Sequence, residues 1–259
     1  MEFAAHIALV AGLIFLAFYG HFVIIAGSAY LVLWRWFPGR FERYRIQNKP
    51  LHTARPKREF ILSTWFSVFF SLLLTVLWVF AELGWTAFYT DVAEYGWGWF
   101  FASILVLALV HDTYYYWAHR FMHHPRVFRY VHKVHHQFHN PTPFASYAFH
   151  PLEAIIESAW VPPLIFLVPI HPAAFAIYVV ILTVLNVISH LGYEFYKPWV
   201  AKWFITSLHH NMHHSRGRGH YMLYFNIWDR LMGTNAADYE ARMRAMRAKA
   251  SAATATGET

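Results

Sequence analysis

Residues 111–136, HDTYYYWAHRFMHHPRVFRYVHKVHH, hold seven of the 19 histidines of this chain, and these histidines recur at helical spacing. His119 and His123 stand four residues apart, so on a helix they lie on one face. The pattern H-x-x-H-H occurs twice, at His132, His135 and His136 and again at His210, His213 and His214. Two copies of so specific a spacing beside apolar segments predict a chemical role for these imidazoles.

The composition predicts a membrane protein. Of the 259 residues, 58% are hydrophobic and only 14% are charged, and the charges are clustered. A bilayer core about 30 Å thick needs about 20 apolar residues as helix, and several windows meet that requirement. Helices are expected because backbone polar groups in lipid must be satisfied within the segment. The formal charge of +7 lies in residues that flank the apolar spans, which favours anionic headgroups over nucleic acid as its partner.

The expected topology places every histidine-rich segment on one side of the membrane. We expect spans at 3–34, 60–81 and 99–116, followed by a hairpin of 152–168 and 172–189. The basic segments 35–58, 120–133 and 190–234 then share one side, which the positive-inside rule assigns to the cytoplasm. Pro162-Pro163 leaves open whether the first leg of the hairpin crosses fully. The predicted fold is therefore all-α, with four to five membrane-embedded helices and a cytosolic helical cap.

One membrane-embedded domain is expected over 1–235, with the histidine motifs in 111–234. A charged C-terminal helix and a disordered tail should follow in 236–259. The short loops and the lack of a terminal di-lysine signal favour a bacterial inner membrane, or the endoplasmic reticulum in a eukaryote.

The histidine patterns suit two metal ions. The chain has no cysteine, so thiolate-held haem and iron–sulfur clusters are excluded, and any ion must be held by imidazole, carboxylate, amide or water. Neutral imidazole suits iron, zinc and copper. In H-x-x-H-H the first two rings can serve one ion, and the third, rotated by about 100°, can reach another. Eight candidate ligands are too many for one ion.

The order of the motifs resembles the fatty acid hydroxylase / sterol desaturase superfamily of integral-membrane di-iron oxygenases. The similarity covers about half of the chain, and it rests on HDTYYYWAHRFMH (111–123), HKVHH (132–136), HPLE (150–153), HLGYE (190–194), HHNMHH (209–214) and WDRLMGT (228–234). The resemblance implies a membrane core under a cap that holds two iron ions, with zinc as a substitute in purified protein and dioxygen as co-substrate.

By this resemblance, the metal ligands are His119, His123, His132, His135, His136, His190, Glu194, His210, His213 and His214. Some relatives carry a histidine where this chain has Glu194, so the role of that carboxylate is left open. Ligating rings usually donate their other N–H to a fixed acceptor. The candidates for orienting the ligands in this way are His111, Asp112, Tyr116, His150, Glu153 and His209. We expect His124, His139 and His220 to contact solvent or headgroups.

The function that the resemblance implies is O2-dependent hydroxylation or desaturation of a C–H bond in a lipid such as a fatty acyl chain, sterol or carotenoid. No catalytic residue is expected beyond the metal ligands. The chain has no G-x-G-x-x-G and no P-loop motif, so electrons should come from a separate ferredoxin or cytochrome b5-like donor with its reductase. The other expected partners are membrane lipids, and nucleic acid is not expected.

Three alternatives make different predictions. A b-type haem protein needs histidine pairs that face each other across spans. A divalent-metal transporter should place its ligands at mid-membrane. A carboxylate di-iron protein would show Glu-x-x-His, and no glutamate in this chain has a histidine three residues later.

Overall fold

The computed structural model describes residues 2–49 and 54–255, and within these ranges the chain is helical without a β-sheet. Three isolated β-bridges occur, at Arg45 with Tyr193, Phe88 with Ile170 and Phe204 with Phe225. The predicted all-α fold is confirmed.

In the described part of the chain, four helices are long and apolar enough to cross a membrane. They are α1 (Glu2–Tyr30) with its π-helical continuation η1 (Leu31–Trp36), α3 (Arg55–Glu82), α4 (Gly96–Met122) and α9 (Pro172–Ser189). In the most apolar window of α1 and η1 only 11% of the residues are buried, although its mean hydropathy is 2.3. An apolar helix with so little protein cover suits a lipid environment.

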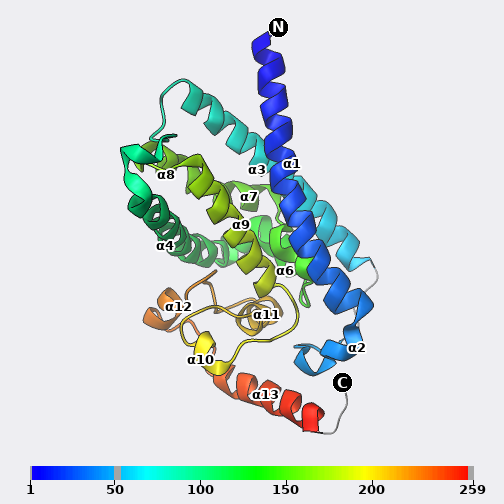
Figure 1. Ribbon diagram of the computed structural model, residues 1–259. Coiled ribbons are helices and arrows are strands. Elements are labelled where there is room, and N and C mark those ends of the chain that lie inside the picture. The colour runs from blue at the N-terminus through cyan, green and yellow to red at the C-terminus, as the bar shows by residue number, and fades with distance from the viewer. Residues whose placement is uncertain (1, 50–53, 256–259) are drawn as a thin grey trace.

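The spans pack as two pairs joined at α9. Helix α1 runs against α3, α4 runs against α9, and α9 also contacts α1, as Figure 1 shows. Aromatic rings fill the centre of this bundle. The ring centroids of Phe18 and Phe70 are 4.9 Å apart, and those of Phe66 and Tyr147 are 5.0 Å apart. This core positions the inner ends of α3, α4 and α9 beneath the cap.

The segment 152–168 does not form one membrane-spanning helix. It divides into α7 (Pro151–Ser158) and α8 (Val161–Leu167), with a break at Ala159 and Trp160. Pro162 and Pro163 occupy the first turn of α8, where the missing N–H groups cost nothing, so they start a new helix instead of continuing the old one. The first leg of the expected hairpin is therefore two short helices.

His119 and His123 lie at the C-terminal end of α4 and His190 directly follows α9. The two H-x-x-H-H motifs lie in a cap of short helices at the same end of the spans (Figure 1). This cap consists of α5 (Pro125–Val131), α6 (Lys133–His136), η4 (Pro143–Tyr147), α10 (Pro198–Ala201), α11 (Ser207–Arg216), α12 (Ile227–Leu231) and α13 (Tyr239–Ala255). At the far end of the spans, η3 (Val92–Glu94) precedes α4.

The basic segment after α1 joins the cap, as the topology predicts. It contains α2 (Pro38–Phe41) and η2 (Glu42–Tyr44). The N–H of Glu194 donates to the Tyr44 carbonyl at 2.8 Å, and the Gln47 amide donates to Asn211 Oδ1 at 2.7 Å. At the other end of the sequence, α13 reaches Ala255 and so extends into the tail that we expected to be disordered, while 256–259 lie outside the described residues.

Candidate metal centre

Local sequence directs the histidines of α4, α6 and α11 toward one another. His119 lies in the last turn of α4 and His123 ends that helix. Pro125 then begins α5, whose N-cap His124 accepts the N–H of Arg126 at 3.3 Å. His132 separates α5 from α6. Helix α11 starts with a capping box and ends at Gly217, whose left-handed φ of +68° suits glycine.

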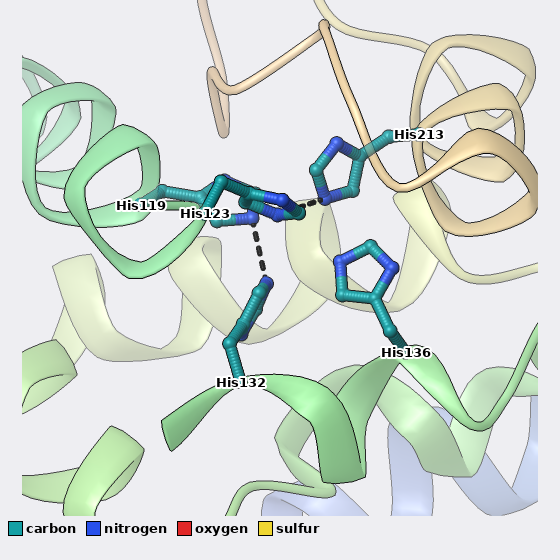
Figure 2. A group of neighbouring side chains, drawn as sticks. All are labelled: His119, His123, His132, His136 and His213. Carbon is teal, nitrogen blue, oxygen red and sulfur yellow. Dashed lines mark hydrogen bonds between the residues drawn. The ribbon is translucent and has the colours of Figure 1, made fainter. Parts of the chain in front are cut away.

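Among the residues that the structure describes, nine imidazoles form two groups. In each group the candidate ligand atoms all lie within 4.8 Å of one another. The five-histidine group consists of His119, His123, His132, His136 and His213. The four-histidine group consists of His135, His190, His210 and His214. Figure 2 shows the first group, in which rings from α4, from the α5–α6 region and from α11 point at a common centre. Eight of the nine rings are buried, and His123 is half-buried.

Three rings in the two groups have a fixed tautomer. Nδ1 of His119 donates to the Tyr221 carbonyl at 2.9 Å, Nδ1 of His213 to the Gly219 carbonyl at 2.6 Å, and Nδ1 of His190 to the Asn186 carbonyl at 2.8 Å. A carbonyl only accepts, so Nδ1 carries the proton in each case. Burial lowers the pKa of His190 to about 4 and holds that of His213 well below its usual value, so these rings are neutral. Each neutral ring therefore directs the Nε2 lone pair inward.

His210 shows that these nitrogens suit a cation. Its Nε2 lies 2.9 Å from Nε2 of His190 and 3.0 Å from Nε2 of His214. An imidazole nitrogen has either one proton or one lone pair, so it forms one hydrogen bond and cannot satisfy both neighbours. Buried Nδ1 atoms of His210 and His214 also lack a partner among the described residues. A metal ion among the Nε2 atoms resolves this crowding, so the donor set fits a metal of the kind that imidazole prefers.

The structure does not bring Glu194 into either group. Its Oε1 accepts the N–H of Tyr196 at 2.7 Å, and its Oε2 accepts the N–H of Leu208 at 2.8 Å. The carboxylate therefore satisfies one loop N–H group, that of Tyr196, and one N–H group in the first turn of α11, where negative charge is favourable. The other nine predicted ligands lie in the two groups. The expectation that the first two rings of H-x-x-H-H serve one ion is wrong. The first and third rings share a group, because a spacing of four residues brings them closer to one face than a spacing of three does, and the second ring lies in the other group.

Of the six candidates for orienting ligands, Glu153 contacts a ligand candidate directly. Nδ1 of His132 lies 2.6 Å from Glu153 Oε1, and both side chains are buried. The others have different partners. Asp112 accepts the N–H groups of Leu223, Tyr224 and Phe225, and Tyr116 contacts Thr234. His150 caps α7, and His209 caps α11 while stacking on Tyr239. Nδ1 of His111 contacts the Tyr178 hydroxyl at 2.6 Å.

Sequence reasoning missed the backbone acceptors and misjudged His220. The expectation that His220 contacts solvent is wrong, because its ring is buried, 5.0 Å from His209, and contacts Asn235. The G-R-G sequence at 217–219 was the available signal for a backbone acceptor. Gly219 has φ of +73°, and a Cβ there would lie 2.7 Å from the Thr234 carbonyl oxygen, so only glycine can present this carbonyl to His213.

Comparison with known proteins places this geometry in a family. The profile of the family described as fatty acid hydroxylase matches residues 104–234, which is 131 of 259 residues. A Delta(7)-sterol 5(6)-desaturase of Gibberella zeae is 30% identical over 198 residues, which cover 76% of this chain and 61% of the relative. Human lathosterol oxidase is 32% identical over 177 residues, which cover 66% of this chain and 59% of the relative.

The chain thus aligns with about three fifths of the length of these two relatives. No solved structure matches it. Both histidine groups lie wholly inside the segment that the family profile matches. With half of its length matched, this chain belongs to the fatty acid hydroxylase family.

Proposed function

We propose that this protein is a membrane-bound di-iron oxygenase that hydroxylates or desaturates a C–H bond of a lipid. The observation that carries the proposal is the pair of histidine groups, whose inward lone pairs are fixed by hydrogen bonds on the far side of the rings. The five-histidine group would hold one ion and the four-histidine group the other. Iron held there would supply the reaction with O2 and the power to oxidise an unactivated C–H bond.

The residues of the chain have three tasks in this proposal. The carbonyls of Tyr221, Gly219 and Asn186 keep protons on Nδ1, and Glu153 orients His132. Burial keeps the rings neutral and excludes water from eight of them. The adjoining spans supply an apolar path for a lipid from the bilayer. The relatives are named sterol desaturases and lathosterol oxidase, which supports a sterol as the first substrate to try.

Hydroxylation by O2 consumes two electrons and two protons, forms one C–O bond and releases one water, so an electron donor is needed. We propose an acidic carrier of the ferredoxin or cytochrome b5 type. Between residues 95 and 237 all nine lysines and arginines are exposed, whereas all five acidic residues are buried. Such a surface attracts an acidic protein.

The docking point would be the edge of His123, the one half-buried ring of the nine. The centroid of this ring lies 5.3 Å from that of Phe128 and 5.2 Å from that of Tyr221. Arg126 follows His123 by three residues, Arg218 lies in the loop after α11, which carries His213, and both arginines are exposed. The same charges assign the cap to the cytoplasmic side by the positive-inside rule.

The haem and transporter hypotheses are not favoured. Haem ligation takes at most two histidines, whereas five and four converge here. A transporter needs ligands at mid-membrane, whereas these histidines lie at the C-terminal ends of α4 and α9 and in the cap helices α6 and α11.

Metal content and lipid chemistry test the proposal. Protein purified without oxygen should contain about two iron ions per chain. Cells that produce the protein with a donor and lathosterol should form an oxidised sterol that cells with the His135→Ala variant lack. His139→Ala, at an exposed histidine outside both groups, is the matched control and should leave the product unchanged. One ion or none per chain, or the same lipid profile for His135→Ala and the unaltered protein, would refute the di-iron oxygenase.

A further inference from the structure

A small cavity lies between the membrane core and both histidine groups. Its volume is about 30 Å³, and residues of α1, α3, α4, α7 and α9 line it. Two of its walls touch the candidate metal centre. The Tyr115 ring lies 5.0 Å from that of His119, and the Phe149 ring lies 5.3 Å from that of His135. A group bound in this cavity would therefore lie beside both sites.

The cavity carries two polar atoms without a partner. Oε1 of Glu157 and the hydroxyl of Ser158 are buried and have no hydrogen-bond partner among the described residues. Two other polar groups of the lining have partners: the Tyr147 hydroxyl contacts Thr183 at 2.8 Å and the Asn186 amide donates to the Ser146 carbonyl at 2.8 Å. A buried polar atom without a partner costs about 1–3 kcal/mol, so two such atoms facing one cavity point to a ligand that satisfies them.

The charge of the cavity restricts that ligand. Burial raises the pKa of Glu157 to about 8, so at neutral pH its carboxyl is mostly protonated and can both donate and accept a hydrogen bond. No lysine or arginine lines the cavity. A carboxylate or phosphate would lie there without a counter-charge, which is costly. A hydroxyl, which also donates and accepts, matches the pair formed by Glu157 and Ser158.

We propose that this cavity binds the hydroxyl end of a neutral lipid alcohol, held by hydrogen bonds to Glu157 and Ser158. The proposal deepens the proposed function and rests on it. A volume of about 30 Å³ suits a hydroxyl and the carbon that bears it, or about two water molecules. The body of the lipid would lie among the rings of Phe18, Phe66 and Phe70, which must move apart to admit it.

Binding to the full-length protein in nanodiscs tests the proposal with two ligand pairs. The pairs are lathosterol with its 3-deoxy analogue and octadecanol with octadecane. The unaltered protein should bind the hydroxylated member about fivefold to tenfold more tightly, which is the value of one or two buried hydrogen bonds. Stearate at pH 7 should bind more weakly than octadecanol.

The variants separate a hydroxyl pocket from a hydrated void. Glu157→Leu should abolish the preference within each pair without weakening the deoxy ligands, whereas Glu157→Gln, which keeps a donor and an acceptor, should retain most of it. Ser158→Ala should lose part of the preference for the hydroxylated ligand. This variant replaces Glu157→Leu in the test if the leucine variant does not fold. Glu240→Gln, at an exposed glutamate of α13, is the control.

Equal binding within both pairs by the unaltered protein, or an unchanged preference in Glu157→Leu and Ser158→Ala, means that the cavity holds water only and overturns the proposal. Failure of the oxygenase proposal is a separate result, because it shows as missing iron or missing oxidised product while the hydroxyl preference persists.

Discussion

His132 and Glu153, 21 residues apart, meet through Nδ1 and Oε1 at 2.6 Å, and both side chains are at most 1% exposed. Glu153 also accepts the N–H of His150 through Oε2 at 3.3 Å, which fixes the carboxyl against the first turn of α7. The contact therefore ties the orientation of one ligand candidate to the helix beside the hydroxyl-binding cavity.

Replacing Glu153 by glutamine should weaken metal binding. The amide oxygen still accepts a hydrogen bond from the His132 ring. Glutamine cannot ionise, however, so it cannot carry the negative charge that strengthens this hydrogen bond. Loss of such a partner typically costs about tenfold to a hundredfold in metal affinity. Competition with a chelator measures the change, with Glu240→Gln as control. Equal affinity in both variants would mean that Glu153 has no influence on the ion.

Gly219→Ala should damage the five-histidine group more than Gly217→Ala does. Both glycines have a left-handed φ, but a Cβ at 217 meets nothing within 4 Å, whereas one at 219 would lie 2.7 Å from the Thr234 carbonyl oxygen. The backbone must then move and take the acceptor of His213 with it. We expect a loss of about 1–2 kcal/mol in unfolding free energy for Gly217→Ala and more for Gly219→Ala. Iron content should fall in Gly219→Ala and stay unchanged in Gly217→Ala. An equal loss of iron in both variants would contradict the steric argument.

His210→Ala should remove one ion and leave the other. Nε2 of His210 contacts two other rings of the four-histidine group at 2.9 and 3.0 Å, and His210 belongs to that group alone. Iron per chain, measured by elemental analysis, should therefore fall from about two to about one. His139→Ala should keep both ions. Loss of both ions from a folded His210→Ala variant would mean that the groups do not bind independently.

The metal-free protein should lose stability in acid. Burial lowers the pKa of His190 to about 4, below its unfolded value near 6.5, so between pH 6.5 and 4 the unfolded chain binds more protons. The unfolding free energy should fall by up to about 1.4 kcal/mol per pH unit for this residue. Denaturant unfolding in detergent at several pH values measures the slope, and His190→Asn should flatten it. An identical slope in the variant would refute this assignment.

Charge reversal should impair electron delivery by a protein but not by a small reductant. With Arg126→Glu and Arg218→Glu together, the rate of reduction by an acidic [2Fe–2S] ferredoxin should fall about tenfold at low ionic strength, and high salt should erase the difference. Reduction by dithionite should stay the same. Arg244→Glu on α13 is the control. If the double variant kept both its rate and its salt dependence, the docking face would lie elsewhere, and tighter vesicle binding by the unaltered protein would then assign these cations to lipid headgroups.

Helical spacing predicted that the histidine motifs serve two ions, because rings three or four residues apart share a face whatever the tertiary fold. It assigned the rings within H-x-x-H-H wrongly, because the first and third rings, four residues apart, share a group and the second lies in the other. It could not predict the fate of Glu194, since its partners are backbone N–H groups of Tyr196 and Leu208 that only the folded chain brings near. Hydropathy predicted the four spans. Pro162-Pro163 marked 152–168 as the apolar segment that need not cross the membrane, and this segment is divided into α7 and α8. Burial of His220 depends on Asn235 and Tyr239, which no local pattern connects to it.

Both histidine groups take members from α11, the five-histidine group through His213 and the four-histidine group through His210 and His214. A nascent chain that has not yet emerged past Ser207 therefore has no complete cage, even though α4, α6 and α9 are already made. In the proposed di-iron enzyme, both ions would therefore be loaded only after α11 has been synthesised. Because α11 contributes histidines to both groups, neither group is complete before this helix is made.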